Sequence, residues 1–338
     1  MLNFKNDHPL QKYNTFGISA QSAYFIEINN SQEILTLLES EIFKQHEILI
    51  LGGGSNMLFT KDFDGLVIYP TFDQIEIVKE TSHEIFVKVG SGIIWDEFVK
   101  HAVQNQWGGV ENLSFIPGKV GAAAVQNIGA YGVEAKNAIE SVEGFDLVRG
   151  KFRSFSQADC QFGYRSSVFK TSYNNDFLIT HLTFRLQKIP HQLKLQYKVL
   201  AEKVSLVDSV NIATVRNIVG QIRQSKLPDV KKVGSAGSFF KNPVVSKSKA
   251  NQLKQDFIAI PFYPDNEDTV KLSAAWLIDQ SGCKGVEKGQ AGSYKGQPLV
   301  LINLGNARGD EILFLANHIQ QKVIEKFGIQ LLPEVVII

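Results

Sequence analysis

Short apolar runs between polar turns dominate the first half of the chain, and they predict strands rather than long helices. Residues 48–51 form such a run and lead directly into three glycines, as a buried strand does where it ends in a loop. Within 182–186, apolar and polar residues alternate, which is typical of a half-buried strand. Three more apolar runs predict further strands, at 66–69, 75–78 and 85–89.

Apolar residues recur at helical spacing in three segments, 93–103, 212–222 and 312–327. The last is the longest, and Gly328 follows it where a C-terminal cap is expected.

The polar, interrupted stretch 190–208 indicates a domain boundary or a long loop. The apolar end of the chain, 331–338, predicts a final strand that Pro333 interrupts. Strands in the first half and longer helices in the second predict an α+β fold of two or three lobes.

Composition narrows the class of protein. The 338 residues correspond to about two domains, with 44% hydrophobic and 20% charged residues, as in ordinary globular proteins. The net charge of +1 makes nucleic acid and an anionic membrane unexpected partners. The N-terminus lacks the apolar core of a signal peptide, and 120–133 is shorter than the roughly 20 residues of a membrane helix.

The two cysteines indicate the cellular compartment in which the protein works. Cys160 and Cys283 are isolated from each other, which excludes both a disulfide framework and a cysteine zinc site. No His-Glu-x-x-His pattern occurs either, so we expect no metal. A reducing, cytoplasmic setting fits this pattern best.

Two blocks of small residues are the main candidates for ligand binding. In 52–56, three glycines precede Ser55 and Asn56, a pattern open to a tight turn or to a phosphate cradle. A dinucleotide Rossmann motif is disfavoured, because Met57 stands where the third glycine belongs. The second block, 116–132, is either a close-packed junction or a surface for a flat ligand. Two such blocks in one half favour an extended nucleotide cofactor.

Three polar residues are candidate catalytic residues, and each also has a purely structural interpretation. Arg165 could clamp a carboxylate or lie on the surface. Ser238 precedes two phenylalanines, as a hydroxyl at a pocket edge would, but the Gly-x-Ser-x-Gly pattern of a serine hydrolase is missing. Glu334, between apolar residues, is an outward strand position or a catalytic carboxyl. The five basic residues in 223–241 form a local anion site or a solvated face.

Taken in order, these segments resemble the UDP-N-acetylenolpyruvoylglucosamine reductase family over nearly the whole chain. The matching motifs lie at 14–17, 52–56, 111–114, 116–118, 126–132, 162–165, 237–243 and 333–335. The long insertion after 162–165 resembles the family's subtype with a tyrosine-bearing loop.

The resemblance implies a monomeric, cytoplasmic enzyme of peptidoglycan precursor synthesis, with non-covalent FAD and the vanillyl-alcohol-oxidase type of fold. NADPH would supply a hydride that reaches C3 of the substrate's enolpyruvyl group, and a proton would be added at C2. It also implies domains: FAD binding in 1–189 (lobes of about 1–70 and 71–189), a loop and linking helix in 190–222, substrate binding in 223–330, and a strand in 331–338 that returns Glu334 to the flavin site.

The resemblance assigns roles to individual residues. Arg165 and Glu334 would stabilise the charge that develops at C2, and Ser238 would donate the proton. The residues expected to contact FAD are Gly52, Gly53, Gly54, Ser55, Asn56, Met57, Gly118, Gly121, Ala122, Gln126, Asn127, Gly129 and Ala130. The residues expected to contact the substrate are Tyr164, Tyr197, Lys226, Asn242 and Gln297.

The sequence departs from the family pattern at two positions, and two alternative functions stay open. Val336 stands where the family usually has Arg, and Ser166 where it often has Asp. The alternatives are another FAD oxidoreductase of the same fold, such as an oxidase of small alcohols, and a flavin- or nucleotide-binding protein without turnover. No His or Cys lies in either small-residue block, which disfavours covalently attached flavin there.

Overall fold

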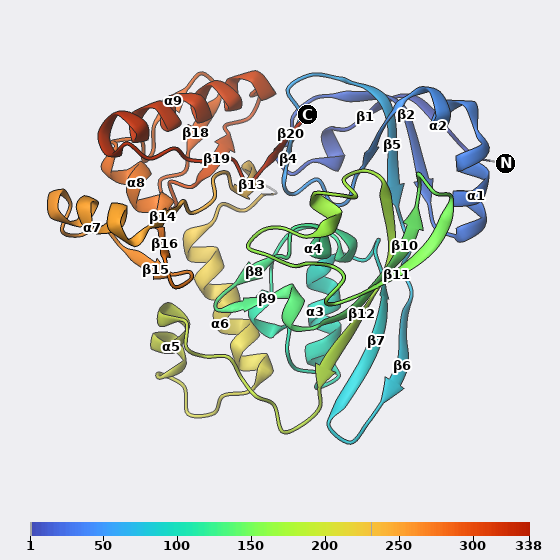
Figure 1. The fold of residues 1–338 in the computed structure, drawn as a ribbon, viewed down its shortest axis with the longest axis horizontal. Helices are drawn as coiled ribbons and strands as arrows, with labels where there is room; N and C mark the ends of the chain where they lie inside the picture. The colour runs from blue at the N-terminus through green and yellow to red at the C-terminus, as the bar shows by residue number, and fades with distance from the viewer. Residues whose placement is uncertain (1, 231) are drawn as a thin grey trace. The chain divides into compact units, whose positions relative to one another are not determined.

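The computed structural model (Figure 1) describes residues 2–230 and 232–338, which form two compact units. Unit 1 comprises 1–8, 22–53 and 64–224, and unit 2 comprises 9–21, 54–63 and 225–338. Each unit is therefore assembled from segments that are far apart in the sequence.

A four-stranded sheet forms the first part of unit 1, in the order β1-β2-β5-β3. Its strands are β1 (Lys5–Pro9), β2 (Gln21–Ile28), β5 (Phe63–Pro70) and β3 (Glu47–Ile50), and the helices α1 (Ser31–Glu39) and α2 (Glu41–Gln45) connect β2 to β3. The Asn30 side chain caps α1 by accepting a hydrogen bond from the Glu33 amide. The strand β3 runs parallel to β5, and the glycine loop leaves the sheet at the carboxyl end of β3.

A five-stranded antiparallel sheet forms the second part, in the order β11-β10-β12-β7-β6. Its strands are β11 (Lys151–Ser156), β10 (Ile139–Asp146), β12 (Phe177–Gln187), β7 (Glu84–Gly90) and β6 (Ile75–Glu80). The helices α3 (Trp95–Gln104) and α4 (Val120–Val125) share its largest apolar core, in which Trp95 contacts Phe98 and Phe184 edge-on or tilted. This core fixes α4, whose first turn carries part of the second small-residue block.

The remaining elements of unit 1 are short, apart from α6. They are β8 (Gly129–Ala130), β9 (Val133–Glu134), α5 (Lys198–Val204), α6 (Ile212–Lys226, whose last two residues belong to unit 2) and the 3₁₀ turns Glu111–Leu113, Ala135–Asn137 and Val168–Lys170. The helices α5 and α6 share a separate apolar cluster that Tyr131 joins.

Unit 2 contains two small antiparallel sheets and three helices. One sheet has the order β13-β19-β18-β17, with β13 (Gly234–Ser238), β19 (Val300–Asn303), β18 (Ala291–Ser293) and β17 (Glu287–Lys288). The other has β14 (Val244–Ser246), β16 (Thr269–Leu272) and β15 (Phe262–Pro264). The helices are α7 (Lys247–Asp256), α8 (Ala274–Gln280) and α9 (Gly309–Phe327), and a 3₁₀ turn spans Gln11–Tyr13. The strands β4 (Met57–Leu58) and β20 (Val336–Ile337) pair in parallel.

All five strands predicted in the first half and all three predicted helices are confirmed within a few residues. Gly328 ends α9 with a φ of +63°, the left-handed cap that was expected. The prediction for 331–338 was wrong in extent: only Val336–Ile337 is a strand, because Pro333 has no amide hydrogen to continue a ladder. The stretch 190–208 also contains a helix, α5.

The compact units differ from the expected domains chiefly in three segments, one of which is the expected loop and linking helix 190–222, since it groups with unit 1. Residues 9–21 and 54–63 were expected with the flavin lobes, and they group with the C-terminal part of the chain instead. Hydrogen bonds explain this grouping: Thr15 Oγ1 donates to the Ser235 carbonyl at 2.6 Å, and Thr60 Oγ1 to the Ile338 carbonyl at 2.7 Å.

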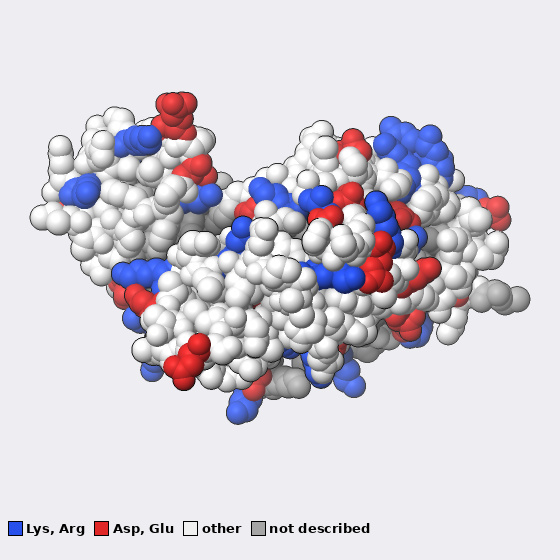
Figure 2. All heavy atoms as spheres, turned by 90° about the horizontal axis from the view of Figure 1, so that it is seen from below, with Lys and Arg blue, Asp and Glu red and all other residues white. Residues whose placement is uncertain are grey.

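Charged side chains of both signs are interspersed on the surface. Red and blue groups lie side by side at several places on the face drawn in Figure 2, as expected from the net charge of +1. Among residues 2–230 and 232–338, no helix is both long and apolar enough to cross a membrane.

Candidate active site

The two small-residue blocks come into direct contact in unit 1. A Cβ atom added to Gly53 would lie 2.7 Å from the Gly118 Cα, and one on Gly52 would lie 3.1 Å from the Ala122 Cβ. Only glycine allows the two backbones to approach this closely. The blocks therefore form one surface, in which Gly52, Gly53 and Gly118 are half-buried.

A buried hydroxyl lies beside this surface without a partner. Ser91 is 1% exposed, and its Oγ has no hydrogen-bond partner among the described residues. A Cβ on Gly121 would lie 2.8 Å from the Ser91 Cβ. An unpaired buried hydroxyl is costly, so a ligand that accepts or donates a hydrogen bond here would remove that cost. The glycine surface and this hydroxyl fit a phosphate-bearing cofactor such as FAD.

Arg165 lies at the tip of a tight turn that is attached to the second block. Gly163 and Ser166 exchange backbone hydrogen bonds of 3.0 and 3.3 Å, and Arg165 between them has a φ of +54°. Its Nη2 donates to the Gly129 carbonyl at 2.9 Å. Its guanidinium carbon also lies 5.5 Å from the centroid of the Tyr164 ring. The strained backbone at this residue is typical of functional sites.

Asn127 holds this turn against the second block. Its Nδ2 donates to the Gly163 carbonyl and to Glu134 Oε2, both at 3.0 Å, and its Oδ1 accepts from the Lys136 amide. The side chain, which was expected to contact the cofactor, is thus engaged with the protein and positions Arg165. Gln126 next to it is half-buried at the end of α4, and Ala130 lies in β8.

Tyr197 lies on the predicted loop at the start of α5, and 47% of it is exposed. Its ring meets the ring of Tyr131 edge-on, with the centroids 5.5 Å apart. Asn112 anchors the same loop by donating from Nδ2 to the Lys194 carbonyl at 2.7 Å. The loop is therefore attached to the part of the second block that carries Tyr131.

In unit 2, Ser238 and Glu334 are held on adjacent backbone segments. The Glu334 amide donates to the Phe239 carbonyl at 2.8 Å, and the Lys241 amide donates to the Leu332 carbonyl at 2.9 Å. Ser238, immediately before Phe239, ends β13 opposite Val300. Both side chains are half-buried.

The first glycine block is also connected to Glu334 within unit 2. Asn56 Nδ2 donates to the Glu334 carbonyl at 3.1 Å, and the Asn56 carbonyl accepts from the Val336 amide at 3.0 Å. Met57 then pairs with Val336 as β4 and β20. Gly54, with a φ of +58°, permits this path, since a Cβ there would lie 1.9 Å from the Tyr13 carbonyl oxygen. Ser55 lies between these residues and is half-buried.

Three expected substrate residues also belong to unit 2. Gln297 has a buried Oε1 without a partner among the described residues, which suits an acceptor for a ligand N–H or O–H group. A Cβ on the neighbouring Gly296 would lie 3.3 Å from the carbonyl oxygen of Lys226, the last residue of α6. Asn242 Oδ1 caps α8 by accepting from the Ala274 amide at 3.0 Å.

The sequence interpretation missed a half-buried cation next to Tyr131. The pKa of Arg223 is lowered, mainly by burial. Tyr131 bonds to the Arg223 side chain and partly offsets the lowering. Burial likewise raises the pKa of Tyr131. The sequence analysis treated Arg223 only as one member of the basic run. Its position on α6, a helix with an apolar face, could have indicated that it is partly buried. Lys231 of the same run lies outside the described residues.

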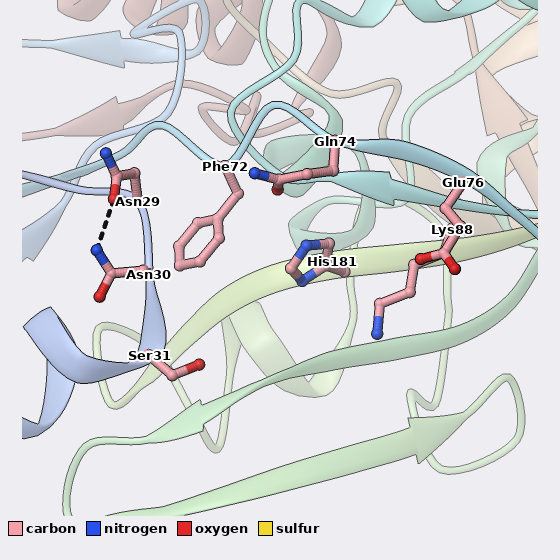
Figure 3. Close-up of a pocket in the computed structure, with 8 residues that line it drawn as sticks. All are labelled: Asn29, Asn30, Ser31, Phe72, Gln74, Glu76, Lys88 and His181. Atoms are coloured by element: carbon pink, nitrogen blue, oxygen red, sulfur yellow. Dashed lines mark hydrogen bonds between the residues drawn. The ribbon is translucent and has the colours of Figure 1, made fainter.

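A separate pocket of about 320 Å³ in unit 1 contains none of the predicted residues. Figure 3 shows its lining, where Phe72 and His181 meet edge-on and Asn30 donates to Asn29. Lys88 in this lining is paired with Glu143 at 2.6 Å. Among the described residues, no cluster of three His, Cys, Asp or Glu could hold a metal ion.

Both cysteines are buried, and burial raises the pKa of Cys160 to about 12 and that of Cys283 in the same direction. Neither is therefore a reactive thiolate.

Known proteins resemble the chain along its whole length. A family model described as the C-terminal domain of UDP-N-acetylenolpyruvoylglucosamine reductase matches residues 228–338, and one described as an FAD binding domain matches 22–153. The reductase of Flavobacterium johnsoniae is 42% identical over 339 residues, and the match covers both chains fully. That of Chromobacterium violaceum is 43% identical and covers 100% of this chain and 99% of the relative.

One solved structure shares the fold. The UDP-N-acetylenolpyruvylglucosamine reductase of Thermus caldophilus superimposes with a TM-score of 0.70 over 100% of this chain and 98% of its own, at 22% identity.

Proposed function

The chain belongs to the UDP-N-acetylenolpyruvoylglucosamine reductase family, and we propose that it reduces the enolpyruvyl ether of UDP-N-acetylglucosamine to UDP-N-acetylmuramate with NADPH. Its fold is α+β, with a two-lobed FAD-binding part of the vanillyl-alcohol-oxidase type and a C-terminal α+β part. The observation that carries the proposal is the backbone pairing that places Glu334 beside Phe239, and thus beside Ser238.

FAD, bound without a covalent link, supplies the two-electron chemistry that passes a hydride from NADPH to the substrate. The glycines at 52–54 and Gly118 would offer peptide N–H groups to its diphosphate. The Gly121 amide already donates to the Ser91 carbonyl at 3.0 Å, so Gly121 would serve only by its lack of a side chain. Gln126, Gly129 and Ala130 would line the flat part of the cofactor.

Hydride addition at C3 leaves negative charge at C2 and on the adjoining carboxylate. Arg165 offers two parallel N–H donors to that carboxylate, the geometry in which guanidinium binds carboxylates best. Glu334, in its protonated form, donates a further hydrogen bond to the developing charge. Before the reaction begins, the Gly129 carbonyl holds the Arg165 guanidinium, and the Asn56 side chain holds the main chain of Glu334, which limits the reorganisation that is needed.

Ser238 donates the proton that C2 requires. A serine hydroxyl is a weak acid in water, but transfer to a carbanion-like centre is favourable if the alkoxide is quickly reprotonated. It ends β13, and the backbone of Phe239 beside it bonds to Leu299 and Glu334, which supports the backbone from which the hydroxyl projects.

The remaining assignments concern the substrate's nucleotide and sugar. Lys226 would neutralise the diphosphate, and Asn242, Gln297, Tyr164 and Tyr197 would contact the rest of the substrate. The orphaned Oε1 of Gln297 supports its role most directly. We also propose that the enzyme acts as a monomer in the cytoplasm, since isolated buried cysteines suit a reducing compartment.

The test is a two-step reaction with purified protein. Bound flavin should be released by heat or acid as FAD, NADPH should bleach its absorbance without oxygen, and the enolpyruvyl substrate should restore the absorbance and yield UDP-N-acetylmuramate. An oxidase of the same fold would be reoxidised by oxygen and not by this substrate. A protein that takes up no FAD would overturn the proposal.

A further inference from the structure

Phe115 has an unusual backbone conformation immediately before the second small-residue block. Its φ is +60°, in the left-handed region that costs a residue with a side chain about 1 kcal/mol or more. Its side chain is 40% exposed, so packing in a core does not hold it there. Three residues later, Gly118 meets Gly53 at the contact between the two blocks. The conformation of Phe115 therefore sets the direction in which the chain enters this contact.

The start of α3 holds the segment on both sides of Phe115. Asp96 Oδ1 accepts from the Phe115 amide at 2.5 Å. The Trp95 indole Nε1 donates to the Leu113 carbonyl at 2.8 Å, and the Trp95 amide donates to the Gly118 carbonyl at 3.0 Å. Trp95 is 1% exposed and belongs to the main core, so α3 provides a rigid support.

The helix α6 holds the same residue through two arginines. Arg223 Nε donates to the Phe115 carbonyl at 3.1 Å. Arg216 binds both carboxylate oxygens of Asp96, at 2.6 and 2.8 Å, and its guanidinium carbon lies 4.5 Å from the centroid of the Phe115 ring. The Arg216 and Asp96 side chains are 12% and 23% exposed, so water screens their interaction little.

Gly220 on the same helix allows the Phe115 ring to lie against α6. A Cβ at this position would lie 2.7 Å from the ring's Cε2 and 3.1 Å from Cζ. In the interior of a helix glycine is less favourable than alanine by about 1 kcal/mol. The glycine is thus explained by the ring that it accommodates.

We propose that Asp96, Arg216 and Arg223 are positioning residues for FAD: they hold Phe115 in its left-handed conformation and so fix the path of the Ile116–Gly118 segment against the first glycine block. This inference rests on the proposed function, because it takes that contact as the place where the cofactor's diphosphate binds. None of the three side chains needs to touch the cofactor, since they act through the backbone of Phe115.

Two substitutions test this positioning role, one by removing a support of Phe115 and one by displacing its ring. Arg216→Ala removes the bidentate partner of Asp96. Gly220→Ala displaces the Phe115 ring, although it improves the intrinsic helix propensity of α6. Each should raise the Kd for FAD roughly tenfold or more and change the visible circular dichroism of bound flavin. Gln221→Ala, an exposed position on the same helix, is the matched control and should change neither. Arg216→Lys keeps the charge without the two-pronged geometry and should recover part of the affinity.

The melting temperature of the flavin-free variants separates positioning from general loss of stability. If Arg216→Ala folds and binds FAD with the affinity and spectrum of the wild type, the proposal is overturned. If the wild-type protein itself binds no FAD, the proposed function fails instead.

Discussion

Single side chains in this protein depend on backbone hydrogen bonds made by their neighbours. Ser238 is the clearest example, because Phe239 beside it donates to the Leu299 carbonyl and accepts from the Glu334 amide. A substitution at Ser238 should therefore remove the hydroxyl while these bonds remain. Its effect can be read as chemistry rather than as unfolding.

Ser238→Ala should leave reduction of the bound flavin by NADPH unchanged and slow its reoxidation by the enolpyruvyl substrate. The loss expected for one general acid is on the order of 10²- to 10⁴-fold. Stopped-flow absorbance of the flavin, without oxygen, measures the two half-reactions separately. Ser238→Cys should retain some activity because a thiol can also donate a proton. Equal slowing of both half-reactions would move the proton donor to another group.

Lys119 gives the protein a dependence of stability on pH. Its side chain is 7% exposed, its ammonium donates to the Pro70 carbonyl at 2.9 Å and lies 3.4 Å from the Tyr69 ring centroid, and no carboxylate pairs with it among the described residues. Burial is the main cause that lowers its pKa from 10.5 to about 8, with Glu27 opposing the shift.

Because the pKa of Lys119 is lower in the folded protein, the unfolded chain binds more protons between about pH 8 and 10.5. The free energy of unfolding should therefore rise with pH across that window, by on the order of 1–3 kcal/mol from this residue. Urea unfolding of the flavin-free protein should show the rise, and Lys119→Met should lack it. Identical pH slopes for the two proteins would contradict the assignment.

Among the elements, the loops after β3 and before α4 meet at glycines and are therefore sensitive to added volume. Gly53 faces a backbone atom at 2.7 Å, whereas Gly52 faces the Ala122 Cβ at 3.1 Å, where a shift of α4 by a few tenths of an ångström is enough. The same added methyl group should therefore have unequal effects at adjacent positions.

Gly53→Ala should weaken FAD binding strongly, and Gly52→Ala should weaken it less, because only the first forces two backbones apart. Fluorescence titration of the flavin-free variants with FAD gives both values of Kd. The reverse order would show that the contact with Gly118 does not shape the cofactor site.

The elements also show what the sequence could predict. The strand at 48–51 and the helix at 312–327 were predictable because hydrophobic periodicity and Gly328 are local signals. The Phe115 conformation was not, since it depends on Asp96, Arg216 and Arg223, which are up to 127 residues apart and carry no common motif. Likewise, nothing local indicates that the Asn127 side chain bonds to the Gly163 carbonyl.

For the whole molecule, the balance of charge limits what it can bind. With a net charge of +1 and opposite charges interspersed on the face in Figure 2, no long-range field attracts a polyanion. Lys226, at the end of α6, would instead serve one diphosphate, since Arg216 and Arg223 on the same helix bond to Asp96 and to the Phe115 carbonyl.

Lys226→Ala should therefore raise the KM for the enolpyruvyl substrate far more than it slows flavin reduction by NADPH. Binding of duplex DNA at about 0.15 M salt should be negligible for both the wild type and the variant, because a small patch is screened there. DNA affinity comparable to that for the substrate, lost in Lys226→Ala, would assign the patch to nucleic acid.

The pairing of β4 with β20 has a consequence for the order in which the protein matures during synthesis. Asn56 and Glu334 are 278 residues apart, so at roughly 5–20 residues per second the ribosome completes the partner strand on the order of 15 to 60 s after the first glycine block. During that interval Asn56 and Met57 lack the backbone partners that hold them. In a nascent chain, Asn56 and Met57 should thus gain these backbone partners only after Val336 and Ile337 have left the exit tunnel, and chains that end before Val336 should lack the pairing.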